Sequence, residues 1–174
     1  TETRYNPRSQ PTAMIDAAGN ITAFRYSGDG NLTNLIDAAG NVTRFEYDSH
    51  GNLTAELDAL GNQTTMEYDF RGQMSKRVNA LGHETSYEYD ARGNLLVQSQ
   101  SWTSNGVPVL VSVTNVYDAE NRVVKVLNPD GSYTETAYNE AGQPRFRWDE
   151  LGRMTETLYN ELGQSIGTIY PDGT

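Results

Sequence analysis

The stretch Tyr47-Asp48-Ser49-His50-Gly51-Asn52-Leu53 recurs along the chain and decides its fold. It returns 21 residues later as Tyr68-Asp69-Phe70-Arg71-Gly72, and again after 21 residues as Tyr89-Asp90-Ala91-Arg92-Gly93. Repetition at a fixed period is typical of a repeat array, so one unit predicts the architecture of its neighbours. Seven inserted residues interrupt the period once, and the tyrosines that keep the register are Tyr5, Tyr26, Tyr47, Tyr68, Tyr89, Tyr117, Tyr138 and Tyr159.

A second four-residue element lies between the tyrosines with the same period, for example Asp37-Ala38-Ala39-Gly40 and Asp58-Ala59-Leu60-Gly61. Both elements begin with Asp or Asn and end with Gly, which is the residue preference of a type I turn. A left-handed Gly after such a turn closes a hairpin through a bulge. Thirteen of the sixteen glycines stand at this fourth position, so we interpret them as turn residues. The turn residues that follow the tyrosines include Asp48, Gly51, Asp69, Gly72, Asp90, Gly93, Asp118, Gly142 and Gly163.

Between the turns the side chains alternate as in a strand of period two. Thr43, Phe45 and Tyr47 would point to one side, and Val42, Arg44 and Glu46 to the other. The sequence therefore predicts an all-β fold of repeated antiparallel β-hairpins with a 21-residue period, which form a twisted sheet. In this sheet each repeat tyrosine would have a structural role, burying its ring and keeping its hydroxyl near a polar edge.

The Tyr-Asp-x-x-Gly-Asn-Leu unit and the following Asp-x-x-Gly resemble the YD repeats of the Rhs (rearrangement hotspot) family, which includes bacterial polymorphic toxins, insecticidal toxin complex subunits, wall-associated proteins and teneurins. The resemblance runs from about Tyr5 to Gly173. Departures are Ser9 and Asn121 in place of the turn Gly, Ser27 in place of the Asp, and Tyr170 where Asp or Asn is expected. In that family the repeats form a sheet that spirals into a hollow shell, which commonly encloses a toxic domain in bacterial members. The resemblance thus implies a wall of an Rhs-type β-shell or barrel that encapsulates a toxic cargo of a secreted bacterial effector.

The period divides the chain into regular repeats over residues 1–97, an extended hairpin insertion over 98–116, and further repeats over 117–174. In the insertion, a loop over residues 101–108 would replace the four-residue turn, and its Trp102 is a candidate for contact with a partner. We interpret the whole as one continuous repeat domain. Neither end shows the polar capping segment of a free-standing array, which predicts a fragment of a longer chain with neighbouring Rhs repeats and the toxin cargo as partners.

Composition limits the classes of function. A hydrophobic content of 36% and a mean hydropathy of −0.66 are low for a packed core. The absence of cysteine excludes disulfides, thiolate zinc sites and thiol nucleophiles. Thirteen basic against 23 acidic residues give a net charge of −10, which disfavours nucleic acid and anionic membranes as partners. No apolar run is long enough for a membrane span. The resemblance to the Rhs family implies a secreted or cell-surface bacterial protein.

The sequence offers no convincing catalytic, cofactor or metal site. Asp48, Ser49 and His50 are adjacent in a turn, whereas a serine triad needs side chains that converge from separate segments. His50 and His83 are the only histidines, and one Asp per turn supplies too few oxygens for calcium. The Asp-Pro-x-Gly-Leu motif with which family members cleave themselves is absent. We therefore expect no enzyme activity and no cofactor.

Two alternatives stay open. One is an extracellular carbohydrate-binding or adhesion module, in which Trp102, Trp148 and the tyrosines stack on sugar rings. The other is an enzyme, which would need a carboxylate pair in a closed pocket.

Overall fold

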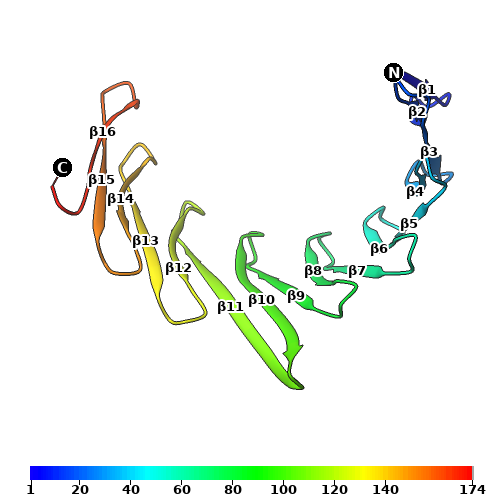
Figure 1. Ribbon diagram of the computed structural model, residues 1–174. Helices are drawn as coiled ribbons and strands as arrows, with labels where there is room; N and C mark the ends of the chain where they lie inside the picture. The colour runs from blue at the N-terminus through cyan, green and yellow to red at the C-terminus, as the bar shows by residue number, and fades with distance from the viewer. Residues whose placement is uncertain (174) are drawn as a thin grey trace. The chain divides into compact units, whose positions relative to one another are not determined.

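A computed structural model describes residues 1–173, and Thr174, the last residue of the predicted segment 117–174, lies outside the described residues. The described chain is one open sheet of sixteen strands whose order follows the sequence from β1 to β16 (Figure 1). Every pair of strands with a defined register is antiparallel. The predicted all-β fold of repeated antiparallel hairpins is therefore confirmed.

The chain divides into two compact units, Thr1–Thr85 and the part that begins at Ser86. The first unit contains β1 (Glu2–Tyr5), β2 (Pro11–Ile15), β3 (Ile21–Tyr26), β4 (Leu32–Ile36), β5 (Val42–Tyr47), β6 (Leu53–Leu57), β7 (Gln63–Tyr68) and β8 (Met74–Val78). The unit boundary falls inside β9 (Glu84–Tyr89). The second unit contains β10 (Leu95–Ser104), β11 (Val107–Tyr117), β12 (Val123–Leu127), β13 (Tyr133–Tyr138), β14 (Pro144–Trp148), β15 (Met154–Tyr159) and β16 (Ser165–Ile169).

Fourteen of the fifteen connections are the predicted type I turn with a left-handed fourth residue. In the turn after Tyr47, the N–H of Gly51 donates to the carbonyl of Asp48 at 3.1 Å, and the N–H of Asp48 donates to the carbonyl of Asn52 at 3.0 Å. All thirteen glycines assigned to turns have positive φ. Ser9 and Asn121, which replace Gly in two turns, keep the left-handed conformation with φ of 60° and 62°.

The strand register shows which side chains share a face. Phe45 lies opposite Glu56, while Glu46 lies opposite Ala55. On the next pair, Met66 lies opposite Arg77 and Thr65 lies opposite Val78. The aromatic and aliphatic positions of the repeat therefore fall on opposite sides of the sheet, which we name the Phe45 face (Phe24, Thr43, Phe45, Glu56 and Met66) and the Ala55 face (Arg44, Glu46, Ala55, Leu57 and Val78).

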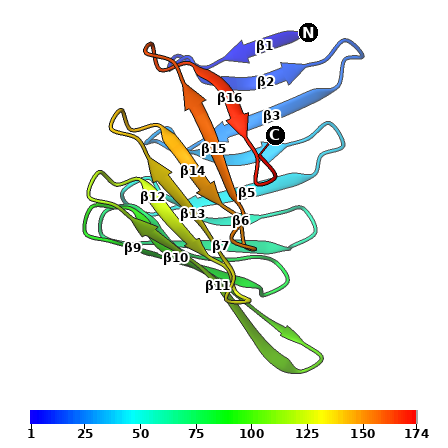
Figure 2. The ribbon, with the colours of Figure 1, turned by 90° about the vertical axis from the view of Figure 1, so that its left-hand side faces the viewer.

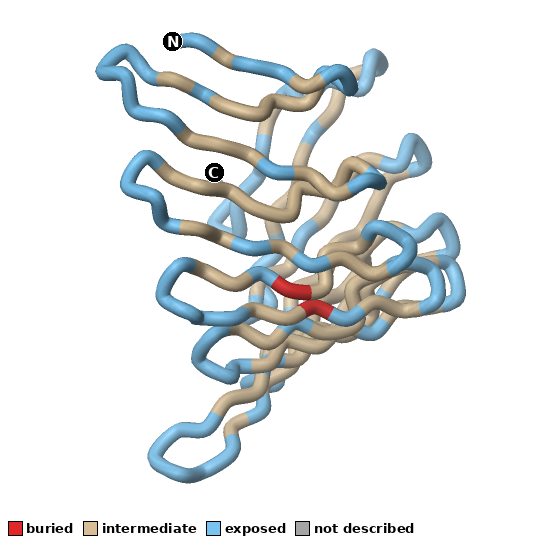
Figure 3. Tube along the Cα trace, turned by 90° about the vertical axis from the view of Figure 1, so that its right-hand side faces the viewer, coloured by how far each residue is buried: buried red, intermediate tan, exposed pale blue. Residues whose placement is uncertain are grey.

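Within neither unit does a second layer cover these faces among the described residues. Of residues 1–173, only Ala55 and Met66 are buried, with 5% and 8% of their surface exposed, and they lie on opposite faces (Figure 3). Each unit is thus a single-layer sheet held by its backbone ladders, its turns and contacts between neighbouring strands.

The hairpin of β10 and β11 corrects one prediction. The connection has only two residues, Asn105 and Gly106, both with positive φ, and not a loop over residues 101–108. Asn-Gly is the preferred pair for a type I′ turn, whose twist matches that of the flanking strands, so both strands continue to its edge. Trp102 consequently lies within strand β10. Figure 2 shows this hairpin extending past the turn that joins β12 and β13.

Candidate functional site

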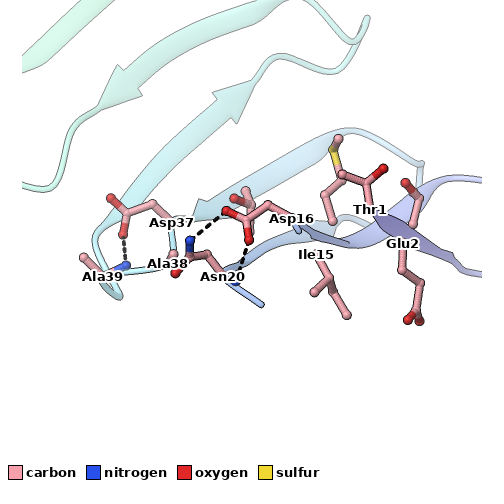
Figure 4. A pocket seen from close by; sticks show the side chains of 11 residues that line it. Thr1, Glu2, Ile15, Asp16, Asn20, Asp37, Ala38 and Ala39 are labelled. Atoms are coloured by element: carbon pink, nitrogen blue, oxygen red, sulfur yellow. Dashed lines mark hydrogen bonds between the residues drawn. The ribbon is translucent and has the colours of Figure 1, made fainter. Parts of the chain in front are cut away.

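The candidate site is the row of turns that follow the tyrosines, which we name the tyrosine edge of each unit. In the turn at residues 48–52, the Oδ1 atom of Asp48 accepts hydrogen bonds from the N–H groups of His50 at 2.8 Å and Asn52 at 2.9 Å. The Nδ2 atom of Asn52 donates to the other carboxylate oxygen at 2.9 Å. One Asp side chain thus satisfies three donors of its own turn. The opposite edge uses the same contacts, as Asp16 with Asn20 shows (Figure 4).

The residue four positions after the turn Asp or Asn is a functional position that the sequence analysis missed. Where the turn begins with Asp, this residue is usually a donor, as in the pairs Asp48 with Asn52 and Asp118 with Arg122. Where the turn begins with Asn, a Gln often follows, and in Asn139 with Gln143 the glutamine oxygen accepts from the asparagine amide at 3.1 Å. Covariation of these two positions across the repeats was the available signal.

These contacts perturb the turn carboxyl groups. The pKa of Asp16, Asp37, Asp48 and Asp58 lies below its ordinary value, chiefly because the side-chain amide of the following Asn donates to the ionised carboxylate, and next because the backbone N–H of that Asn also donates. Burial acts in the opposite direction and raises the pKa of these groups, so the lowering comes from hydrogen bonding in the turn.

We expect the fold to lose stability in acid through these turns. A carboxyl group whose folded pKa lies below its unfolded pKa stabilises the fold above the unfolded pKa, and this contribution disappears as the pH falls through the folded pKa. Urea unfolding followed by circular dichroism from pH 7 to pH 2 should show a falling midpoint. Asp48→Asn is the matched variant, since Asn occupies the same position in other repeats. Its deficit relative to wild type should shrink in acid, and two parallel pH curves would contradict the assignment.

The repeat tyrosines join neighbouring hairpins at the tyrosine edge. The backbone ladder between β2 and β3 ends at the pair Ala13 and Ala23, and beyond it the hydroxyl of Tyr26 donates to the carbonyl of Pro11 at 2.9 Å. The same bond recurs at 2.9 to 3.0 Å, always to the first residue of the preceding strand, in the pairs Tyr68 with Leu53, Tyr117 with Leu95, Tyr138 with Val123 and Tyr159 with Pro144. We name this contact the tyrosine clamp.

The tyrosine rings are half-buried rather than enclosed. Tyr26, Tyr47, Tyr68, Tyr89, Tyr117, Tyr138 and Tyr159 are of intermediate exposure, and burial raises the pKa of Tyr47. Tyr5 is 62% exposed. The assigned turn residues Asp69, Asp90, Asp118, Gly72, Gly93, Gly142 and Gly163 all lie in the tyrosine-edge turns. The side chains of Asp69, Asp90 and Asp118 each accept hydrogen bonds from residues of their own turn.

Successive turns also contact each other along this edge. The Nε2 atom of Gln10 donates to the carbonyl of Gly30 at 2.8 Å, and that of Gln143 donates to the carbonyl of Gly163 at 2.6 Å. In the second unit, Asn94 donates to the side-chain oxygen of Asn121 at 2.9 Å. The turns therefore support each other across repeats as well as closing their own hairpins.

The cavities of the structure are shallow spaces between turns. One, of about 650 Å³, lies between Met14, Asp16, Asn20, Asp37 and neighbouring residues of the first unit (Figure 4). A second, of about 460 Å³, contains His50 and Arg71 beside Asp48 and Asp69. The backbone N–H of His50 donates to the Asp48 carboxylate at 2.8 Å, so this contact is part of the turn itself. The part of the chain that the structure describes has no cluster of three metal-ligating side chains.

The structure does not bring the two tryptophans together. Trp102 lies on β10 and Trp148 on β14, and the strands β11 to β13 lie between them in the sheet. Trp148 instead neighbours Phe146 on its own strand, with ring centroids 6.0 Å apart. Both tryptophans are half-buried. A shared stacking platform for a sugar is therefore not formed by these two residues.

The chain is similar in structure to parts of much larger toxin proteins. Two similar solved structures are a crystal structure of TcdB2-TccC3-Cdc42, with a TM-score of 0.30, and the Photorhabdus luminescens Tc holotoxin pore, with a TM-score of 0.29. Each is 14% identical in sequence and aligns with 95% of this chain, which covers 16% of the other. No curated protein sequence matches the chain. The described residues include no helix that could cross a membrane.

The model of the RHS repeat family matches four overlapping segments, residues 5–42, 26–63, 47–82 and 68–103. Successive matches begin 21 residues apart, at Tyr5, Tyr26, Tyr47 and Tyr68. They span more than half of the chain and agree with the hairpin period of the structure. The chain belongs to the RHS repeat family.

Proposed function

We propose that this chain is a structural wall segment of an Rhs-type shell that encapsulates a toxic cargo of a secreted bacterial effector. In this role the sheet confines the cargo and keeps it apart from its surroundings until delivery. The chain itself would carry out no chemistry, and its partners would be the cargo and neighbouring repeats of a longer polypeptide.

The observation that carries the proposal is the single-layer sheet. A free-standing domain buries an apolar core between two layers, whereas among residues 1–173 only Ala55 and Met66 are buried, and they lie on opposite faces. A wall has one face toward the interior and one toward the exterior, so it needs no single core buried between layers. The alternation of half-buried and polar side chains on both faces supports that role.

The turn and clamp contacts support a mechanical role for the repeat residues. Asp48 accepts two backbone N–H groups and the side-chain amide of Asn52 within its own turn, and Tyr68 donates to the backbone carbonyl of Leu53. A nucleophile or general base would instead direct its polar atoms to a substrate. We therefore propose that these residues maintain the wall and do not catalyse a reaction.

Cysteine labelling of the two faces tests the enclosure. Glu46 on the Ala55 face and Glu56 on the Phe45 face are both exposed, lie on adjacent strands, and point to opposite sides of the sheet. Because the chain has no cysteine of its own, Glu46→Cys and Glu56→Cys each supply a single thiol. In the longer polypeptide, a bulky maleimide should modify one of the two thiols at least about tenfold faster than the other.

The 174-residue chain alone is the control for intrinsic reactivity, and there both thiols should react at similar rates. Urea should abolish the difference in the longer polypeptide as well. Equal labelling of both thiols in the folded, longer polypeptide would show that neither face is enclosed, and the shell proposal would then be wrong.

A further inference from the structure

The hairpin of β10 and β11 differs in composition from the rest of the chain. No charged residue occurs between Arg92 and Asp118, although 21% of all residues are charged. The register places Trp102 opposite Val109 on one face of the hairpin and Ser101 opposite Leu110 on the other. Neither the repeat pattern nor the wall function requires this long uncharged ribbon.

One edge of β11 is open over seven residues. Strand β12 pairs with β11 only from Thr114 to Tyr117. The preceding residues, Val107 to Val113, have β10 as their only partner strand within residues 1–173. The backbone groups that point away from β10 in this segment are therefore available to another strand.

The proline in this segment shows which residues offer those groups. Pro108 has no N–H and is tolerated in a strand where its nitrogen faces an open edge. Backbone groups of an antiparallel strand alternate in direction, so Leu110 and Ser112 direct their N–H and carbonyl groups to the same side as Pro108. The open edge thus presents two donors and three acceptors.

The side chains at this edge are apolar and poorly covered. Leu110 is 70% exposed and Val107 is 61% exposed. Proteins commonly protect such edges with lysine, a bulge or a covering loop, and Pro108 is the only such feature in this segment. An exposed β-branched strand without charge favours pairing with another uncharged strand.

The segment Val107-Pro108-Val109-Leu110-Val111-Ser112-Val113 is nearly symmetric about Leu110. We propose that two copies of this chain pair through it, antiparallel and around a two-fold axis at Leu110. Val109 then lies opposite Val111 of the second copy, and Val107 lies opposite Val113. The two Leu110 side chains meet on the axis, which covers the exposed apolar surface of both.

The hydrogen bonds agree with this register. The two Leu110 residues exchange two backbone hydrogen bonds, and each Ser112 N–H donates to the carbonyl of the opposing Pro108. The missing N–H of Pro108 removes two further bonds. Four bonds and seven residues a side make a small interface, so we expect a weak, concentration-dependent dimer.

A second copy fits this edge because the edge is complementary to itself. A two-fold contact closes after one partner, and the open segment is the same length as the symmetric sequence. This inference goes beyond the wall function, since it depends only on β10 and β11 and requires no cargo.

Sedimentation velocity of the 174-residue chain over a concentration series tests the association. We expect a monomer and dimer equilibrium that Leu110→Lys weakens at least about tenfold, because it places like charges opposite each other on the axis. Leu162→Lys is the matched control, since Leu162 is also an exposed leucine, at 84%, but lies in a turn. A wild-type chain that stays monomeric at all concentrations, or a dimer that Leu110→Lys leaves unchanged, would overturn the proposal.

Disulfide trapping tests the register. Leu110→Cys should cross-link to itself under oxidation, because the Cα atoms of a hydrogen-bonded antiparallel pair are about 5.5 Å apart, within the range of a disulfide. Pro108→Cys should not cross-link to itself, since the two Cα atoms would be roughly 14 Å apart along the strands. Mixed with Ser112→Cys, however, it should give a cross-linked dimer.

The cysteine variants also separate specific pairing from random collision. Equal self-cross-linking of the Pro108→Cys and Leu110→Cys chains would indicate non-specific aggregation and overturn the two-fold register. Circular dichroism of the reduced variants should match wild type, which confirms that the substitutions leave the sheet intact.

Discussion

Replacing Gly40 with valine is expected to lower the free energy of unfolding by about 2 to 3 kcal/mol, through backbone strain alone. Gly40 has a φ of 85°, and a Cβ atom added at this position meets no other atom within 4 Å. A Cβ atom is therefore accommodated at this position, and we expect the cost to come from forcing a β-branched residue into the left-handed region. Urea unfolding of the 174-residue chain at pH 7 measures the change.

Gly28 provides the matched control, because a Cβ atom there also meets nothing within 4 Å and its φ is not positive. Gly28→Val should cost less than about 1 kcal/mol. Similar costs at both positions would mean that the turns tolerate either conformation. The interpretation of the fourth turn residue as an obligate left-handed position would then be wrong.

The turns were predictable because their chemistry is local. Asp48 and Gly51 are three residues apart, and the bonds that define the turn join atoms of the same five residues. Repetition strengthened the prediction, since each copy of the motif tested the same interpretation. Ser9 and Asn121 follow the same geometry because the bonds of the surrounding turn hold them left-handed.

The repeat pattern predicts a longer loop at residues 101–108, but the 21-residue period is interrupted between Tyr89 and Tyr117 and does not apply to this hairpin. The Asn-Gly pair alone favours a two-residue type I′ turn, and the alternating valines that follow it agree with a long strand. The Asn-Gly pair is therefore a better predictor of this connection than the 21-residue period.

The relation between the faces could not be predicted from alternation alone. Period two separates Phe45 from Glu46 within one strand, but the bulge at each turn decides which residue of the next strand lies opposite. The register shift between Glu46 and Tyr47 is such an irregularity. Alternation also does not indicate the acceptor of the tyrosine hydroxyl, which for Tyr68 is the carbonyl of Leu53, 15 residues away.

Replacing Tyr68 with alanine is expected to cost about 2 kcal/mol of unfolding free energy, less than a fully buried ring would cost because this ring is half-buried. The substitution removes the ring from between two hairpins and leaves the carbonyl of Leu53 without the hydroxyl that donates to it at 3.0 Å. Tyr68→Phe keeps the ring and removes only the hydroxyl, so it should cost about 1 kcal/mol.

Tyr5 is the control for the tyrosine clamp, because it is a tyrosine at the same position of the repeat but is 62% exposed. Tyr5→Ala and Tyr5→Phe should each change the free energy of unfolding by less than about 0.5 kcal/mol. If Tyr68→Phe were as mild as Tyr5→Phe, the hydroxyl bond would contribute nothing and the tyrosine would act through its ring alone. A clear cost at Tyr68 only would show that the clamp continues the connection between hairpins beyond the end of the backbone ladder.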